Sequence, residues 1–138
     1  MSSTDEVVIA THIGQPRERA FELFTQSVDD WWQRTEDQHT AVISLDEGGL
    51  VASSSGTVEV IAHVAVWNPP SRLELDWHGP HSKPGDRVLV EFEDLGISTR
   101  VIIRHRRAGL APAQADGGVI GLWWADRLAV IAEVSRRV

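Results

Sequence analysis

The sequence predicts an α+β fold in which a curved antiparallel sheet of about seven strands wraps around a long C-terminal helix. Two observations lead to this fold class. Runs of β-prone residues with alternating polarity fill the middle of the chain, and the turns between them are short. Residues 119–138 instead repeat apolar side chains at helical spacing, with no breaker after Gly121. At 138 residues, the chain is expected to form one domain, residues 1–138.

Two short helices are expected near the N-terminus. Pro16 suits a first helical position, and apolar residues recur at helical spacing from Ala20 to Val28. Ser27 and Asp30 have the spacing of a capping box. This spacing predicts a break, followed by a second short helix that carries the Trp31-Trp32 pair.

The strands are expected on both sides of a double proline. Leu73, Leu75 and Trp77 alternate with charged residues, so one face of this strand is buried and the other is solvated. Residues 68–71, which contain Pro69-Pro70, are expected to form a turn between two strands, because proline donates no hydrogen bond to a sheet. Residues 33–40 are expected to be loop. The expected strands are residues 6–13, 41–45, 50–54, 57–67, 73–77, 87–93 and 98–106. In residues 87–93, alternation turns Val88, Val90 and Phe92 inward and Leu89 outward.

The C-terminal helix is expected to follow a loop over residues 108–118, a segment rich in Ala, Gly, Pro and Gln. Its apolar stripe is formed by Ile120, Trp124, Leu128 and Ile131. Further apolar residues broaden the stripe, so this helix is expected to contact more than one surface. They are Leu122, Trp123, Val130 and Val134.

Charge and composition argue against several classes of protein. A net charge of −7 disfavours nucleic acid and anionic membrane surfaces as partners, because both attract clustered Lys and Arg. The chain has no cysteine, which excludes disulfides and thiolate catalysis and is compatible with a reducing compartment. Neither a signal peptide nor a membrane-spanning stretch is expected. We therefore expect a cytoplasmic protein without a membrane partner.

Several segments carry a family resemblance when they are taken in order. They are residues 8–32 with the Trp31-Trp32 pair, Trp67-Asn68-Pro69-Pro70-Ser71-Arg72-Leu73 with Trp77 beyond, Thr99-Arg100-Val101 leading to His105, and Trp124 followed by Leu128 and Ile131. Together they resemble the START-like (SRPBCC) helix-grip superfamily, in its branch of activator-of-heat-shock-protein-ATPase homologues. The resemblance covers nearly the whole chain and implies a hydrophobic cavity between the sheet and the C-terminal helix. One departure is Trp123, which stands where the family usually has glycine.

Six residues are candidates for contact with a ligand. Trp77, Phe92, His105 and Trp124 are placed around the implied cavity, and Trp67 and Trp31 are weaker candidates. For the aromatic residues the alternative is ordinary core packing. The face of Trp67 stays open, because Trp67 breaks the alternation of the valines before it and could cap the sheet edge instead.

His105 is the one candidate acid or base. Alternation turns its imidazole inward on a strand that is otherwise apolar on that face, where it could orient a ligand or transfer a proton. The alternative is a histidine satisfied by a backbone carbonyl or a tryptophan neighbour. His78 and His81 lie three residues apart but lack further ligands, so no metal is expected, and no other cofactor either.

Three functions follow from these residues and the resemblance. The first is binding of a small hydrophobic or aromatic molecule, by sequestration or carriage, with residues 108–118 as a gate. The second, implied by the superfamily, is a polyketide cyclase or dehydratase that uses the same cavity and His105. The third is a protein-interaction domain that works with a chaperone, as the name of the branch suggests. A homodimer stays open in each case.

Overall fold

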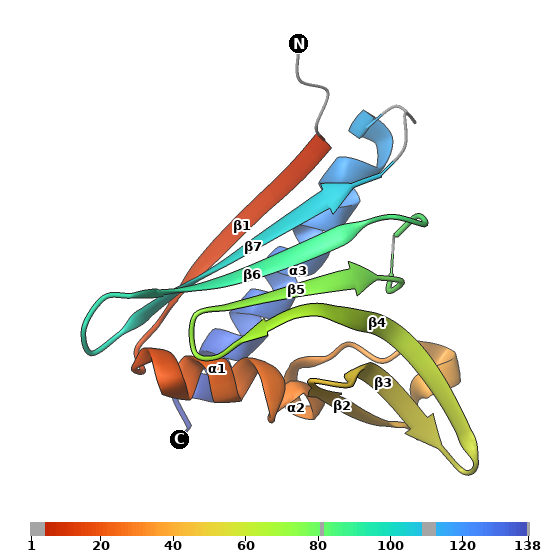
Figure 1. Cartoon of the computed structure of the whole chain (residues 1–138), viewed down its shortest axis with the longest axis horizontal. Coiled ribbons are helices and arrows are strands. Elements are labelled where there is room, and N and C mark those ends of the chain that lie inside the picture. Colours follow the sequence, from red (N-terminus) through yellow and green to blue (C-terminus); the bar gives the residue numbers. More distant parts are fainter. Residues whose placement is uncertain (1–4, 81, 109–112, 138) are drawn as a thin grey trace.

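The computed structural model describes residues 5–80, 82–108 and 113–137, and it confirms the expected fold class. A seven-stranded antiparallel sheet has the order β1-β7-β6-β5-β4-β3-β2 (Figure 1). The strands are β1 (Asp5–Ile13), β2 (Val42–Asp46), β3 (Gly49–Ser54), β4 (Thr57–Asn68), β5 (Arg72–Trp77), β6 (Arg87–Asp94) and β7 (Thr99–Arg107). The helices are α1 (Arg17–Thr25), α2 (Val28–Trp31), the short 3-10 helix η1 (Glu36–Gln38) and α3 (Ala113–Ser135).

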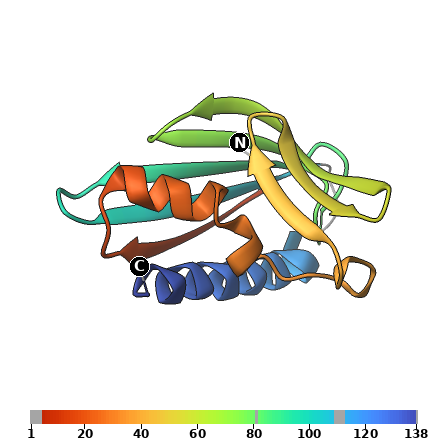
Figure 2. The same ribbon diagram turned by 90° about the horizontal axis from the view of Figure 1, so that it is seen from below.

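All the helices except η1 pack on the concave face of the sheet. Figure 2 shows α3 running beside β1, with α1 and α2 across the same face, and the contacts between these elements agree. Because β1 pairs with β7, the first and last strands close one side of the grip around α3. Within the described residues, no helix combines the length and the apolarity that a membrane crossing requires.

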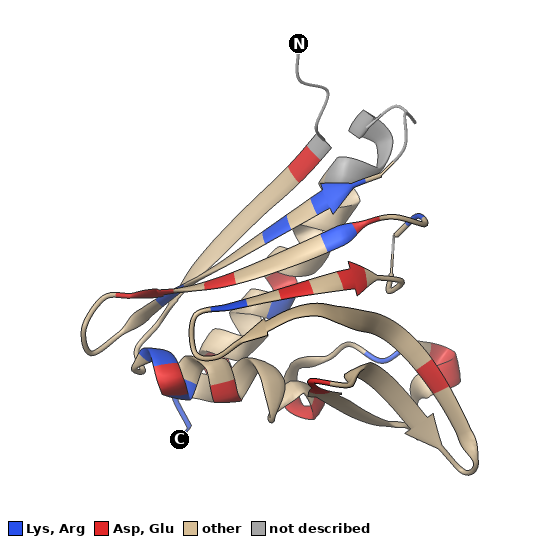
Figure 3. Cartoon of the chain, viewed as in Figure 1, with Lys and Arg blue, Asp and Glu red and all other residues tan. Residues whose placement is uncertain are grey.

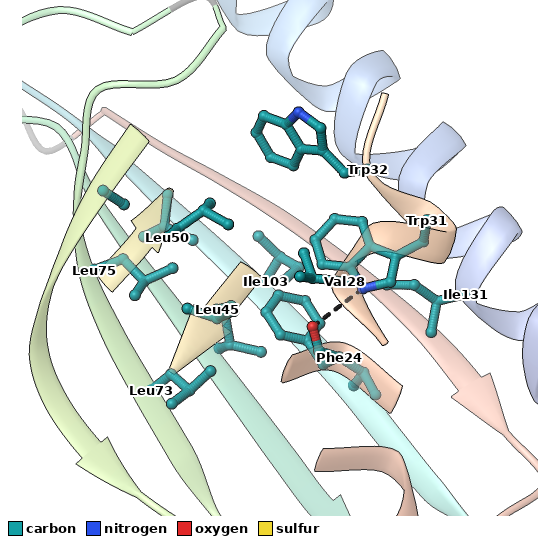
Figure 4. Close-up of a cluster of buried hydrophobic side chains, with 14 of the residues drawn as sticks. Phe24, Val28, Trp31, Trp32, Leu45, Leu50, Leu73, Leu75, Ile103 and Ile131 are labelled. Atoms are coloured by element: carbon teal, nitrogen blue, oxygen red, sulfur yellow. Dashed lines mark hydrogen bonds between the residues drawn. The ribbon is translucent and has the colours of Figure 1, made fainter. Parts of the chain in front are cut away.

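The core lies on the inward face that alternation predicted. Leu73, Leu75 and Trp77 are buried in β5, and the apolar stripe of α3, from Ile120 to Ile131, is buried against the sheet. Figure 4 shows part of this core, where the indole N–H of Trp31 donates to the Phe24 carbonyl at 3.1 Å. Each fully buried leucine of this kind contributes about 2 kcal/mol of hydrophobic stabilisation.

The N-terminal helices differ from expectation in detail. α1 ends at Thr25, so Val28 belongs to α2, and the break falls where the sequence predicted it. The Ser27 side chain makes no capping hydrogen bond, however, so the capping box is wrong. Part of the expected 33–40 loop is η1, where the Gln38 side chain accepts a hydrogen bond from the Thr35 N–H at 3.1 Å.

The expected loop over residues 108–118 is wrong for its second half. α3 begins at Ala113, and residues 109–112 lie outside the described part of the chain. Pro112 stands next to this start in the sequence, where proline favours the first turn of a helix.

Leu122 is 75% exposed and does not belong to the buried stripe of α3. The four residues predicted to form that stripe, at positions 120, 124, 128 and 131, are all buried.

Leu89 is a second exception to the expected faces. Alternation turns it outward, yet it is buried in β6, which has a neighbouring strand on each side. Its cross-strand neighbours are Glu74 on β5 and Arg104 on β7, whose long side chains are themselves half-buried. The apolar stems of such charged residues cover neighbouring apolar surface while the charged ends stay in water.

A β-bulge decides the face of Trp67. Val64 pairs with Leu75, but Val66 pairs with Glu74, so Ala65 is an extra residue in β4. One inserted residue reverses the alternation beyond it. Trp67 therefore pairs with the inward-facing Leu73 and lies on the concave face, just before the cis Pro69-Pro70 turn.

Candidate functional site

Aromatic side chains fill the space between the sheet and α3. The Trp77 ring lies 5.2 Å from Trp124 and 6.0 Å from Trp123, centroid to centroid, and both of these belong to α3. Trp32, next to α2, packs on the same group at 5.9 Å from Trp77. Trp77 and Trp124 are each only 1% exposed. The residues expected to surround a cavity here contact one another.

Phe92 and Trp31 belong to a neighbouring part of the same core. Phe92 lies 5.1 Å from Phe21 and 5.9 Å from Phe24, centroid to centroid. Trp31 packs on Phe24 at 4.8 Å, and both Phe92 and Trp31 are buried. Ligand contact by Trp31, Trp77, Phe92 and Trp124 stays a prediction, since it requires these rings to move apart.

His105 lies within this aromatic group and is held on both sides of its ring. The Trp124 indole N–H donates to Nδ1 of His105 at 3.0 Å, and Nε2 lies 3.0 Å from Oδ2 of Asp86. An indole nitrogen is only a donor, so Nδ1 must carry a lone pair and the proton must sit on Nε2. That Nε2–H donates to the Asp86 carboxylate. The contacts thus assign one neutral tautomer of His105.

Asp86 completes a buried chain of hydrogen bonds. Its other oxygen, Oδ1, accepts from the Ala108 N–H at 2.9 Å. His105 is 1% exposed and Asp86 is 2% exposed, so this carboxylate depends on its partners in place of water. The chain ties β7, the start of β6 and α3 together. His105 is thus hydrogen-bonded by a tryptophan neighbour, as one of the two interpretations of the sequence expected. Neither ring nitrogen is open to a substrate in this packing.

Asp86 could not be found from the sequence. It follows the polar segment 82–85, where a carboxylate usually faces water. Only the pairing of β6 with β7, which places Val88 beside His105, brings Asp86 to the imidazole.

The indole nitrogen of Trp77 is unusual among the buried polar atoms. It has no hydrogen-bond partner among the described residues. Gly79 packs directly on this ring, since a Cβ atom at residue 79 would lie 2.6 Å from Cζ2 of Trp77. A buried N–H without an acceptor is uncommon, and the interior beside Trp77 is therefore a place where an acceptor could bind.

An open pocket of about 480 Å³ lies elsewhere, between α1, the end of β2 and the turn after β4. We call it the α1 pocket. It is lined by Glu18, Phe21, Glu22, Thr25, Gln26, Leu45, Asp46, Trp67, Pro69 and Pro70. Its volume is typical of sites for small molecules, which span about 300–1,000 Å³. Of the six residues predicted for the site, Trp67 lines this pocket and the other five do not.

The wall of the α1 pocket is aromatic and apolar, and its rim is acidic. Trp67 meets Phe21 edge-to-face, with centroids 5.4 Å apart and planes at 81°. The rim carries Glu18, Glu22 and Asp46, and the lining includes no Lys or Arg among the described residues. The pocket went unnoticed in the sequence because α1, β2 and β4 contribute to it from separate parts of the chain.

The described residues offer no metal site, since no three of their His, Asp or Glu side chains cluster closely enough to hold an ion. The α1 pocket, which is open, and the aromatic interior around Trp77, which is closed, are candidate sites that contain residues predicted from the sequence.

The fold defines the class of protein. A seven-stranded antiparallel sheet that grips a long C-terminal helix, with two short helices after the first strand, is the START-like helix-grip architecture. The chain belongs to the family of Activator of Hsp90 ATPase homolog 1-like proteins, whose model matches residues 15–134. This confirms the family resemblance read from the sequence.

Solved structures with the same fold are distant in sequence. Protein MLL2253 from Mesorhizobium loti has a TM-score of 0.71 at 17% identity, over 96% of this chain and 98% of that one. CalU16 from Micromonospora echinospora has a TM-score of 0.68 at 17% identity, over 96% and 76% of the two chains. The Aha1 dimer from Colwellia psychrerythraea has a TM-score of 0.67 at 16% identity, over 93% of each chain. No curated protein matches the sequence.

Proposed function

We propose that the protein binds a small hydrophobic or aromatic molecule in the α1 pocket and sequesters or carries it. The observation that carries the proposal is an open pocket of about 480 Å³ whose wall is formed by Trp67, Phe21 and the double proline. A concave site that combines aromatic and apolar walls with polar groups is the usual form of a small-molecule site.

Apolar burial would supply the affinity. At about 25 cal/mol per Å² of buried apolar surface, a ligand that buries about 200 Å² gains about 5 kcal/mol before the costs of association. The edge-to-face contact holds the Trp67 ring on Phe21, so this side chain loses little freedom when a ligand binds. A flat aromatic ligand also loses little freedom of its own, so it should bind better than a flexible ligand of equal area.

The interior around Trp77 is a second location for the same function. Its support is the buried Trp77 N–H, which a ligand with an acceptor atom could satisfy. Entry would require the contacts of Trp77 with Trp123 and Trp124 to open. The α1 pocket needs no such change, and for this reason we place the ligand there.

The other two functions have less support. A cyclase or dehydratase would use His105, whose two ring nitrogens are engaged by Trp124 and Asp86. A chaperone-associated role rests on the name of the family. The Colwellia structure is a dimer, which is compatible with a homodimer of this chain as well.

Nuclear magnetic resonance of the side-chain N–H groups tests the proposal. The chain has six tryptophans, and their indole signals report separately on the two locations. Titration with acridine, a neutral flat aromatic molecule, should shift the Trp67 indole and the backbone amides of α1. Shifts confined to the Trp77 and Trp124 indoles would move the site to the interior. Unchanged spectra across a panel of neutral and charged aromatic compounds would rule out the binding function.

A further inference from the structure

We infer that the ligand of the α1 pocket is an organic cation, with a positive charge attached to an aromatic or aliphatic body. This inference rests on the proposed function and adds the charge of the ligand to it. The inference is drawn from the lining of the pocket, which combines an aromatic wall with three carboxylates and contains no cationic side chain.

Of the three carboxylates at the rim, only Glu22 pairs with a cation among the described residues. Glu18 makes no ion pair with another described residue, and Asp46 accepts the Gly48 N–H through Oδ1 at 2.7 Å. Glu22 pairs with Arg19 at 3.0 Å, but both side chains are nearly half exposed, and such pairs are weak. Figure 3 shows the acidic positions along α1 in red. The mouth of the pocket therefore keeps a negative potential.

Three arginines, Arg17, Arg72 and Arg87, interact with groups other than the carboxylates of the pocket. Arg72 and Arg87 both bind the Glu74 carboxylate, and Arg87 also binds Asp76. Arg17, at the start of α1, is directed at the Ser71 hydroxyl, 3.4 Å from its Nη1. None of these guanidinium groups lines the pocket. A ligand cation would therefore meet the carboxylates without competition from a cation in the lining.

Two further features favour positive charge. Thr25 and Gln26, at the C-terminal end of α1, line the pocket, and the last turn of this helix contains no basic residue. The negative end of the helix dipole lies there. Trp67 and Phe21 also present π-electron density, and a cation near an aromatic ring is attracted to it. The carboxylates, the helix end and the rings act in the same direction, and the chain as a whole carries a net charge of −7.

Three ligands of one shape isolate the effect of charge. At slightly alkaline pH, 9-aminoacridine is a cation, acridine is neutral and acridine-9-carboxylate is an anion. Titration calorimetry on the full chain should show 9-aminoacridine binding about tenfold more tightly than acridine at low salt, and the anion binding weakest. Added sodium chloride should narrow the difference, because salt screens exposed charges.

A matched pair of variants ties the preference to the rim. Glu18→Gln with Asp46→Asn removes two charges from the lining while keeping the oxygen that accepts the Gly48 N–H. Glu36→Gln with Asp37→Asn, on η1, removes the same charge from exposed positions outside the lining. The first double variant should lose most of the preference for 9-aminoacridine and keep its affinity for acridine. The double variant on η1 should leave the preference for 9-aminoacridine and the affinity for acridine unchanged.

The possible results distinguish a failure of the inferred ligand charge from a failure of the proposed binding function. Equal binding of acridine and 9-aminoacridine would overturn the inferred charge of the ligand and leave the binding function standing. A cation preference that survives Glu18→Gln with Asp46→Asn would overturn the role of the rim. Failure of all three acridines to bind would overturn the binding function and the inference with it.

Discussion

The aromatic interior beneath α3 and the α1 pocket contain the same kinds of side chain, but the first is closed and the second is open. Trp77 is enclosed by strand, helix and three other indoles, so its ring is buried. Trp67 has Phe21 on one side and the pocket on the other, so its ring stays half-buried. The difference shows that a tryptophan on the concave face becomes part of the core or lines an open pocket according to the number of elements that surround it.

The comparison predicts its largest effect at Trp77. Trp77→Ala should lower the free energy of unfolding by about 4 kcal/mol, because it leaves a large cavity among Trp32, Trp123 and Trp124. Urea unfolding followed by circular dichroism measures this loss. Trp77→Phe is the milder variant, and it should keep more of the stability. A fully stable Trp77→Ala protein would show that the interior is not tightly packed.

A somewhat smaller effect is expected at Asp86. Asp86→Ala leaves the Nε2–H of His105 and the Ala108 N–H without an acceptor, and each buried unpaired donor costs about 1–3 kcal/mol. We expect a loss of about 3 kcal/mol. Asp86→Asn keeps one acceptor oxygen and should cost less. The His105 ring signals, observed by nuclear magnetic resonance, should lose the single neutral tautomer in the alanine variant, and an unchanged ring spectrum would contradict the assignment.

Gly79 gives a third test of the packing around Trp77. Gly79→Ala would place a methyl group 2.6 Å from Cζ2 of the Trp77 ring, so the ring or the backbone must shift at a cost of about 1–3 kcal/mol. Gly14→Ala is the matched control, since nothing lies within 4 Å of the Cβ position there. Equal thermal stability of the two variants would show that Gly79 does not support the ring.

The fold was predictable because it depends on local patterns. Alternation placed Leu73, Leu75 and Trp77 in the core, and helical spacing placed the stripe of α3. The start of α3 was not predictable in this way, because residues 108–118 have the composition of a loop although α3 begins at Ala113. Composition reports local preference, and the packing of a helix against the sheet can outweigh it.

The candidate site was less predictable because it depends on contacts between distant residues. The inserted Ala65 reverses the face of Trp67, and the broken alternation of the valines did not distinguish a bulge from a position at the sheet edge. Asp86 reaches His105 only through the register of two strands. Glu18 and Asp46 come together because α1 lies beside the end of β2. Sequence reasoning found Trp67 as a candidate but could not find its neighbours.

The affinity of acridine for Trp67→Ala, compared with Trp77→Phe, tests the central claim most directly. Trp67 is half-buried at the pocket wall, so Trp67→Ala should cost less stability than Trp77→Ala and should weaken acridine binding at least about tenfold. Trp77→Phe should bind acridine as the unchanged protein does. The opposite result, with binding lost in Trp77→Phe and retained in Trp67→Ala, would place the ligand in the interior and contradict the account.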